Sequence, residues 1–287
     1  MKSRTPASWL RPEPLLAVIL WGGVYPGAKL ALREIPAPSV LSLRLVFATF
    51  ALFVVSGLFA PRRERPSWSC LLPAGLAQTA FQVCLVAGLS RTTAGNSAVL
   101  LATAPLLAAG WLVLTRRAVM GARRWTGLLL ALVGVGVMVQ NSVEVSGSRL
   151  SGDLLALGAA AAWAWYGLAI GPLVESVGTR VATAWTMLLA AAVVVPLSAG
   201  ELLRMPWGTV SWPAWIGLLY GATAGMVLAM SLWGRAIHTL GPRDTMIYLY
   251  LEPVSAVVIA ALLLGESMSL SQGIGALVVL GGVWLAS

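Results

Sequence analysis

Apolar stretches long enough to cross a bilayer as α-helices, about 20 residues each, recur along the whole chain. Only 10% of the 287 residues are charged and the mean hydropathy is +0.86, whereas a soluble domain carries about 25% charged residues. The alternating pattern that membrane strands require is absent. We therefore predict an all-α integral membrane protein.

The spacing of the apolar stretches predicts ten transmembrane helices joined by short links. The expected ranges are 14–32, 38–59, 71–89, 94–115, 124–140, 153–171, 180–198, 214–236, 244–264 and 271–286. The longest link, 199–213, holds Trp207 and Trp212, a residue type enriched where a membrane meets water. The first apolar stretch shows no small-residue cleavage site, so we expect it to remain in the mature protein.

The net charge of +9 has an explanation other than nucleic-acid binding. With a cytoplasmic N-terminus, the inner segments hold most of the basic residues, including Arg62, Arg63, Arg116, Arg117 and Arg180. The outer links hold fewer: Arg33, Arg91, Arg149 and Arg204. Basic residues favour the cytoplasmic side of a membrane. We expect a multi-pass membrane protein with both termini in the cytoplasm and no nucleic-acid partner.

An internal repeat is indicated by residues of related type at one fixed offset. When Pro105 is aligned with Pro253, four further pairs fall into register: Asn96 with Asp244, Ser97 with Thr245, Gly127 with Gly275, and Gly134 with Gly282. We divide the chain into repeats at 1–140 and 141–287. Because five helices is an odd number, the second repeat inserts upside down relative to the first. Inverted repeats are common in secondary transporters, which bind substrate between the halves near the midplane.

The ninth expected helix carries the costliest residues for a membrane span. A charge at a helix centre costs about 2.5–3.5 kcal/mol on insertion scales, and Glu252 is followed by Pro253. Asp244, Tyr248 and Glu252 recur at helical spacing, which predicts one polar face toward a cavity. Glu252 is a candidate for binding a substrate ammonium or carrying a proton; the alternative is a structural ion pair. We assign coupling or gating to Glu252, Asp244, Pro105 and Pro253.

Amide and aromatic side chains supply the other candidates for contact with substrate. Gln78 and Gln82 stand one turn apart and could bind both ends of an amino acid or only join helices. Trp21 and Trp163 lie in the first expected helix of each repeat, which makes them better candidates than the other tryptophans for lining a substrate path; packing in the bundle or contact with lipid is the alternative. The full set of predicted substrate-binding residues is Trp21, Tyr25, Gln78, Gln82, Trp163, Tyr166, Tyr248 and Glu252.

Three isolated basic residues have structural explanations that we prefer to functional ones. Lys29 lies toward the outer end of the first helix, from which a lysine can extend to the lipid headgroups. Arg44 is deeper in the second helix and is expected to pair with a carboxylate or with backbone carbonyls. His238, the one histidine, lies at a helix end, where a cation is favoured by the helix dipole.

Several motifs resemble those of the EamA-type members of the drug/metabolite transporter superfamily. The matching segments are Trp21 to Tyr25, Pro38 to Arg44, Leu89 through Pro105, Ala236 through Pro253, and Gly265-Glu266. The resemblance covers both repeats and implies a ten-helix carrier of the bacterial inner membrane, commonly an exporter of amino acids or related metabolites. One departure is that Thr115-Arg116 replaces the first repeat's counterpart of Gly265-Glu266, so a symmetric role for that glutamate is in doubt.

We therefore expect a secondary transporter that exports amino acids, preferably aromatic or bulky apolar ones, by alternating access. Lipophilic cations or drugs are the alternative cargo, because aromatic rings also bind cations. An intramembrane enzyme is disfavoured, since no nucleophile–base pair or cluster of metal ligands is evident. We expect no cofactor and no metal, and protons as the possible coupling partner. Monomer and homodimer remain open.

Overall fold

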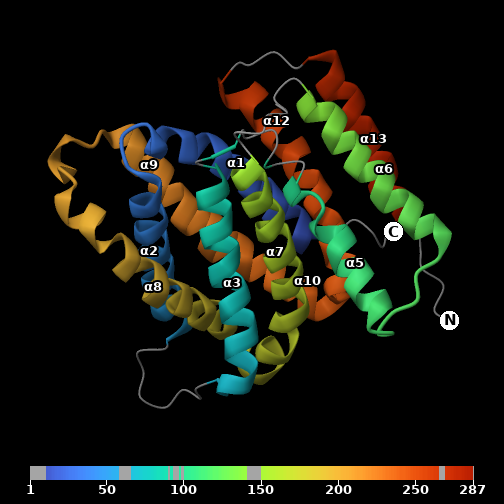
Figure 1. Ribbon diagram of the computed structural model, residues 1–287, viewed down its shortest axis with the longest axis horizontal. Coiled ribbons are helices and arrows are strands. Elements are labelled where there is room, and N and C mark those ends of the chain that lie inside the picture. The colour runs from blue at the N-terminus through green and yellow to red at the C-terminus, as the bar shows by residue number, and fades with distance from the viewer. Residues whose placement is uncertain are drawn as a thin grey trace.

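The computed structural model describes residues 11–57, 66–89, 91–92, 97, 100–140, 150–264 and 269–286, and within these ranges it is helical, with no strand (Figure 1). Five helical segments among them are long and apolar enough to cross a membrane. They are Ala37–Ser56, Trp68–Gly88, Leu150–Val177, Thr179–Arg204 and Trp212–Leu240. The prediction of an all-α membrane protein is confirmed.

The described helices before residue 140 are α1 (Pro12–Leu32), α2 (Ala37–Ser56), α3 (Trp68–Leu89), α5 (Ala104–Leu114) and α6 (Ala122–Val139). Four of these five helices follow the predicted ranges closely, whereas α5 begins ten residues after the predicted start at 94. Helix α2 ends where Gly57 adopts a left-handed conformation with φ of 63°, which glycine reaches without steric cost.

The later helices include two departures from regular α-helix. The elements are α7 (Leu150–Val177), α8 (Thr179–Arg204), the short 3-10 turn η4 (Trp207–Thr209), α9 (Trp212–Tyr220), the π-helix η5 (Gly221–Ala229), α10 (Met230–Leu240), α11 (Pro242–Thr245), the 3-10 helix η6 (Met246–Tyr250), α12 (Leu251–Leu264) and α13 (Leu270–Ala286). Gly241, with φ of 80°, ends α10 immediately before Pro242, as the Gly-Pro pair predicts.

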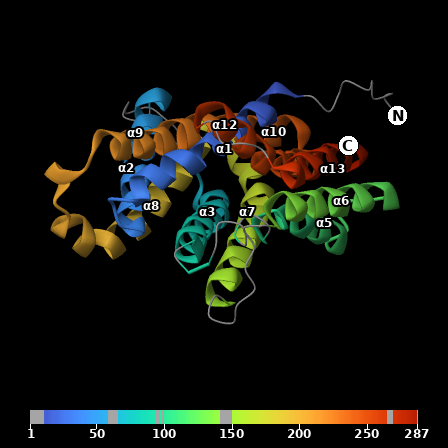
Figure 2. The ribbon, with the colours of Figure 1, turned by 90° about the horizontal axis from the view of Figure 1, so that it is seen from above.

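The closest packing joins helices that are far apart in the sequence. Helix α6 runs beside α13 in both views (Figures 1 and 2), α3 packs on α7, and α2 packs on α8. Helix α1 packs on α9, η5 and α12. Elements before residue 140 are thus held mainly by elements after residue 150, so the two parts of the chain interleave.

Paired glycines explain the close contact between α6 and α13. A Cβ atom at Gly127 would lie 2.7 Å from the Gly282 carbonyl oxygen, and one at Gly134 would lie 2.9 Å from the Gly275 carbonyl oxygen. Only glycine leaves room for backbones at this separation. Because the earlier glycine of α6 meets the later glycine of α13, the two helices run antiparallel.

A second glycine-rich surface seats α1. A Cβ atom at Gly22 would lie 2.8 Å from the Ala256 nitrogen of α12, and one at Gly27 would lie 3.2 Å from the Gly217 oxygen of α9. The Tyr220 hydroxyl donates a hydrogen bond to the Leu20 carbonyl at 3.2 Å. These contacts fix α1 between the segment that holds η5 and the segment that holds Glu252.

The stretch expected as one continuous helix over 244–264 is instead divided into α11, η6 and α12. A 3-10 residue advances about 120° around the axis and an α residue about 100°, so the five residues of η6 add about 100° of rotation. Asp244 and Glu252 therefore do not share the single face that continuous α spacing predicts.

The two prolines singled out in the sequence lie in the first turns of α-helices. Pro105 lies near the start of α5 and Pro253 near the start of α12. Proline is tolerated there because the first N–H groups of a helix have no partner inside the helix. Each proline therefore begins a helix within its membrane segment.

Candidate functional site

Five aromatic residues from four helices meet in the interior, and we call them the aromatic cluster: Trp21 of α1, Phe81 of α3, Trp163 and Tyr166 of α7, and Trp233 of α10. The ring centroids of Trp21 and Trp163 are 5.4 Å apart in an edge-to-face arrangement. Trp233 lies 5.1 Å from Trp21, and Phe81 lies 4.6 Å from Trp163. Tyr166 stacks on Trp163 at 5.4 Å. The predicted pair Trp21 and Trp163 is thus in direct contact.

The cluster combines deep burial with unused hydrogen-bond donors. Trp163 is 4% exposed and Trp233 is fully buried, and neither indole Nε1 has a partner among the described residues. Trp21 differs, because its Nε1 donates to the Gly225 carbonyl of η5 at 3.0 Å. A buried donor without a partner costs about 1–3 kcal/mol, so a polar ligand would find two donors ready.

The two predicted glutamines lie on the α3 face beside Phe81. Gln78 is fully buried and Gln82 is 5% exposed. The Gln78 amide donates to the Met187 sulfur of α8 at 3.7 Å, while its Oε1 has no partner among the described residues. A thioether is a weak acceptor, so Gln78 has an amide oxygen and most of its donor capacity left for a ligand.

The turn of α12 that carries Glu252 packs against α1 close to Trp21. The Ser255 hydroxyl donates to the Val18 carbonyl at 2.9 Å and to the Glu252 carbonyl at 2.8 Å. Glu252 itself is half-buried. Tyr248 is 6% exposed, and its hydroxyl accepts a hydrogen bond from the Arg11 backbone N–H at 3.3 Å.

Asp244 has a partner of its own outside the cluster. Its Oδ1 lies 2.9 Å from Nη1 of Arg124 in α6, and Nη2 of Arg124 donates to the Arg243 carbonyl at 2.7 Å. The ion pair ties α6 to α11. Asp244 therefore contributes to holding these elements together, separately from the turn that carries Glu252.

Arg44 lies beside η5, which also binds Trp21. A Cβ atom at Gly221 would lie 2.9 Å from Nε of Arg44, and one at Gly225 would lie 3.9 Å from its Nη2. Its Nε is buried without a hydrogen-bond partner among the described residues. Gly221 and Gly225 of η5 thus leave room for the Arg44 guanidinium. The Gly225 carbonyl of the same π-helix also accepts the hydrogen bond from the Trp21 indole.

The aromatic cluster includes two residues that were not predicted from the sequence as binding residues. Phe81 and Trp233 were not among the predicted binding residues, although Phe81 follows Gln78 by three positions and so shares its face. The predicted Tyr25 lies in α1, but its side chain, like that of Lys29, falls outside the described part of the structure. His238 is exposed on the last turn of α10, at a helix end as predicted.

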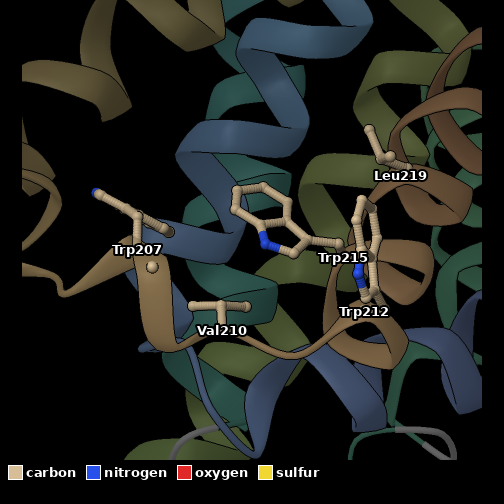
Figure 3. A pocket seen from close by; sticks show the side chains of 6 residues that line it. Trp207, Val210, Trp212, Trp215 and Leu219 are labelled. Atoms are coloured by element: carbon tan, nitrogen blue, oxygen red, sulfur yellow. The ribbon is translucent and has the colours of Figure 1, made fainter.

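The link between α8 and α9 carries a different kind of surface. An open hollow of 520 Å³ is lined by Trp207, Val210, Trp212, Trp215 and Leu219, and the Trp215 ring extends across it from α9 (Figure 3). Trp212 is 80% exposed. Exposed tryptophans at the end of an apolar helix are typical of a membrane–water interface, so we assign this hollow to contact with lipid.

The fold is thus that of a membrane protein built from packed helices around a buried centre of aromatic rings and polar atoms. Comparison with known sequences names the family. The profile of the family described as "EamA-like transporter family" matches residues 14–140 and 150–287. The chain belongs to that family, which confirms the resemblance drawn from its motifs.

Named relatives are similar over nearly the full chain. From Salmonella typhimurium, "Uncharacterized inner membrane transporter YicL" is 26% identical over 95% of this chain and 93% of that protein. "Probable amino-acid metabolite efflux pump" of the same species is 26% identical over 94% of this chain and 92% of that protein. "Threonine/homoserine exporter RhtA", also from that species, is 28% identical over 89% of this chain and 84% of that protein. A crystal structure of another protein, 16% identical, superposes with a TM-score of 0.82 over 96% of this chain and 95% of that one. This last likeness concerns the fold alone.

Proposed function

We propose that the protein is a secondary transporter that exports amino acids across the bacterial inner membrane, with the aromatic cluster as its substrate site. The observation that carries the proposal is that Trp21, Phe81, Trp163 and Trp233 meet from four helices, and that the indole donors of Trp163 and Trp233 have no partner among the described residues. Family membership and relatives named as an efflux pump and an exporter support the direction of transport.

The composition of the cluster favours aromatic or bulky apolar amino acids. Aromatic faces bury apolar side chains and stack on other rings. The indole N–H groups of Trp163 and Trp233, which have no partner among the described residues, suit a substrate carboxylate. The carboxylate of Glu252, one turn before the Ser255 that bonds to Val18 of α1, suits an ammonium. Release of the substrate amine would allow the Glu252 carboxylate to take a proton, which is the coupling that we propose.

Two symmetry relations support ten spans arranged as inverted repeats. The repeat offset maps Gly127 onto Gly275 and Gly134 onto Gly282. If each glycine in the contact between Gly127 and Gly282 is replaced by its counterpart in the other repeat, the result is the contact between Gly275 and Gly134. Both contacts are present. An exchange of the two halves that reproduces the packing is the property of a two-fold axis, as inverted repeats require.

Helix packing and the sequence profile add to this support. The exchange of halves turns the contact of α3 with α7 into the contact of α1 with the α9–α10 segment, and both are extensive. The family profile matches once in each half. With ten spans and basic residues concentrated in the inner links, both termini lie in the cytoplasm.

Lipophilic cations are the second candidate cargo, favoured by the same observation. Five aromatic residues within one cluster offer ring faces to a cation, and this attraction grows to about 2 kcal/mol or more when the cation is desolvated. Glu252 would then act as a counter-charge rather than as one half of a zwitterion site.

The test is counterflow of radiolabelled amino acids in proteoliposomes, screened over all twenty and homoserine. Counterflow needs no imposed gradient, so it tests carriage apart from coupling. We expect phenylalanine, tryptophan, leucine or methionine to accumulate, and tetraphenylphosphonium to compete weakly. Accumulation of tetraphenylphosphonium alone would select the cation hypothesis, and no accumulation of any of these would overturn the proposal.

A variant series separates the site from the coupling. In Glu252→Gln we expect exchange of amino acids to fall by about tenfold or more, because a hydrogen bond to a charged group contributes about 1.5–3 kcal/mol. Asp244→Asn is the matched control, since it removes a carboxylate on the same segment that pairs with Arg124 outside the cluster. Equal losses of exchange in both variants would show that Glu252 has no special role.

A further inference from the structure

A hollow of 260 Å³ lies between elements of both halves, and no residue of the aromatic cluster lines it. It is lined by Val55 and Ser56 at the end of α2, by the 177–181 junction between α7 and α8, and by Arg235 of α10. Because a water molecule accounts for about 30 Å³ of liquid volume, the space admits a small anion together with several waters.

Ser56 gives this hollow a buried hydroxyl without a hydrogen-bond partner among the described residues. The residue is 3% exposed, yet its Oγ has no hydrogen-bond partner among the described residues. A serine in a helix commonly donates to a carbonyl one turn earlier, as Ser198 does to Val194 at 2.8 Å. Ser56 does not, and it lines the hollow instead. Its hydroxyl is therefore available to a ligand.

Positive charge converges on the same space. Arg180 and Arg235, both exposed, belong to its lining, and none of its described lining residues is acidic. Helix α8, which has 26 residues, begins there with Gly178 as its N-cap and no side-chain cap. Its first N–H groups thus lack an internal partner and carry the positive end of the helix dipole.

Two glycine features hold the hollow in this form. Gly178 has φ of 80°, which turns the chain sharply from α7 into α8. A Cβ atom at Gly234 would lie 2.5 Å from Cγ2 of Thr179, so the glycine allows α10 to approach the start of α8. That approach places Arg235 beside the N-terminus of α8.

We propose that this hollow is a binding site for a phosphate-type oxyanion, either the headgroup phosphate of an anionic phospholipid or a free phosphate. Two guanidinium groups, a serine hydroxyl and the N-terminus of a long helix are the donors that such anions select. The basic residues of this end lie on the cytoplasmic side in the proposed topology, where anionic lipids attract them. The site goes beyond the transport proposal, because it does not depend on the cargo.

The first test measures thermal unfolding of the purified protein by tryptophan fluorescence. Sodium phosphate is compared with sodium chloride at equal ionic strength in neutral detergent, and phosphatidylglycerol with phosphatidylcholine in nanodiscs. We expect stabilisation by phosphatidylglycerol, by phosphate, or by both, which identifies the source of the anion. Absence of stabilisation by either would overturn the proposal, whatever the counterflow result.

Variants then locate the effect. Arg180→Gln and Arg235→Gln should each raise the apparent dissociation constant about tenfold or more, because each removes charge-assisted hydrogen bonds. The control is Arg117→Gln, an exposed arginine of the link between α5 and α6 that does not line the hollow. An equal effect of all three variants would mean diffuse electrostatic attraction and would overturn the site.

Ser56→Ala separates anion binding from a purely structural role. Without the anion, removing a buried hydroxyl that has no partner leaves stability unchanged or higher. With the anion, the variant should lose affinity about threefold to tenfold. Ser176→Ala, which removes a hydroxyl bonded to the Leu173 carbonyl at 2.9 Å, serves as control and should leave anion binding unchanged. Unchanged anion affinity in Ser56→Ala would contradict the assigned geometry.

Discussion

At the scale of single residues, the buried indole nitrogens are the strongest link between structure and proposed function. Trp163 and Trp185 both have an Nε1 without a partner among the described residues, but they lie in different surroundings. Trp163 belongs to the aromatic cluster, whereas the Trp185 ring contacts Phe53 at 5.8 Å. The two residues therefore form a natural pair of test and control.

Trp163→Phe should raise the substrate concentration for half-maximal counterflow about tenfold, because one hydrogen bond to a charged substrate group is lost while an aromatic ring remains. Trp185→Phe should leave that concentration unchanged. Both variants lose part of the ring volume, which lowers stability, and both lose a donor without a partner among the described residues, which raises it. Their unfolding temperatures should therefore shift by similar, small amounts. If Trp185→Phe impaired counterflow as strongly as Trp163→Phe, the cluster would not be the substrate site.

Glu34, in the link between α1 and α2, gives a residue-scale prediction about pH. The Ser211 hydroxyl donates to Oε1 at 2.6 Å and the Ser211 N–H donates to Oε2 at 2.7 Å. These bonds hold the pKa of the Glu34 carboxyl below its ordinary value of 4.5. A carboxyl with a lowered pKa stabilises the fold above its ordinary pKa, and this contribution disappears as the pH falls through the lowered value.

We therefore expect wild-type protein to lose more thermal stability than Glu34→Gln as the pH is lowered from neutral to below 4.5. Ser211→Ala should fall between the two, because it removes the hydroxyl bond and keeps the backbone bond. The measurement is the unfolding temperature across this pH range. Parallel curves for wild type and Glu34→Gln would contradict a stabilising role for the link between Glu34 and Ser211.

Part of this residue-scale picture could be predicted from the sequence. Trp21 and Trp163, from the first helix of each repeat, were predicted as binding residues, and the structure places their rings in contact. Trp233 was not predicted as a site residue, because its position depends on how α10 crosses α1 and α7. Such crossings follow from tertiary packing, which helical periodicity within one segment does not specify.

At the scale of helices, the contact between α6 and α13 depends on glycine. A Cβ atom at Gly282 would lie 2.8 Å from the Gly127 carbonyl oxygen, whereas one at the neighbouring Gly281 would meet nothing within 4 Å. Gly282→Ala should therefore destabilise the fold by about 1–3 kcal/mol, the usual cost of overpacking. Gly281→Ala should be neutral or slightly stabilising, since alanine favours helix.

Both variants are assessed by thermal unfolding in the same detergent, with yield of monodisperse protein as a second measure. Equal stability of Gly282→Ala and Gly281→Ala would mean that α6 and α13 are not in backbone contact. That result would also remove one of the symmetry relations that support inverted repeats.

The elements themselves were easier to predict than their internal geometry. Apolar length and turn residues such as Gly241-Pro242 were sufficient to locate α1, α2, α3, α6 and α13 to within about three residues, whereas α8 extends six residues beyond its predicted end at 198. The 3-10 helix η6 and the π-helix η5 were missed, because their sequences are as apolar and regular in pattern as those of α-helices. Both occur where a segment packs against α1, so tertiary contact overrides local preference there.

At the scale of the whole molecule, interleaved packing makes the halves dependent on each other. Among the described helices, the three most extensive pairings, α6 with α13, α3 with α7, and α2 with α8, each join one half to the other. A motion that opens a path on either side of the membrane must therefore slide or separate such a pair. The α2–α8 pair differs at its two ends, which makes it the best candidate.

One end of the α2–α8 pair is closed by a hydrogen bond between the hydroxyls of Ser42 and Ser198, and the other end borders the hollow at Ser56. In the proposed topology the serine pair lies toward the outer side. Export by alternating access requires these outer ends to part so that substrate can leave. A covalent link between them should therefore stop the cycle.

The variant Ser42→Cys/Ser198→Cys, made with Cys70 and Cys84 replaced by serine, tests this directly. Hydroxyls in hydrogen-bond contact place the two Cβ atoms near the separation that a disulfide needs. After oxidation we expect counterflow to fall to background, and reduction should restore it. Each single cysteine variant should retain activity under both conditions. Full counterflow with the disulfide quantitatively formed would show that the outer ends of α2 and α8 stay together, and would move the search for the outer opening to α3 and α7.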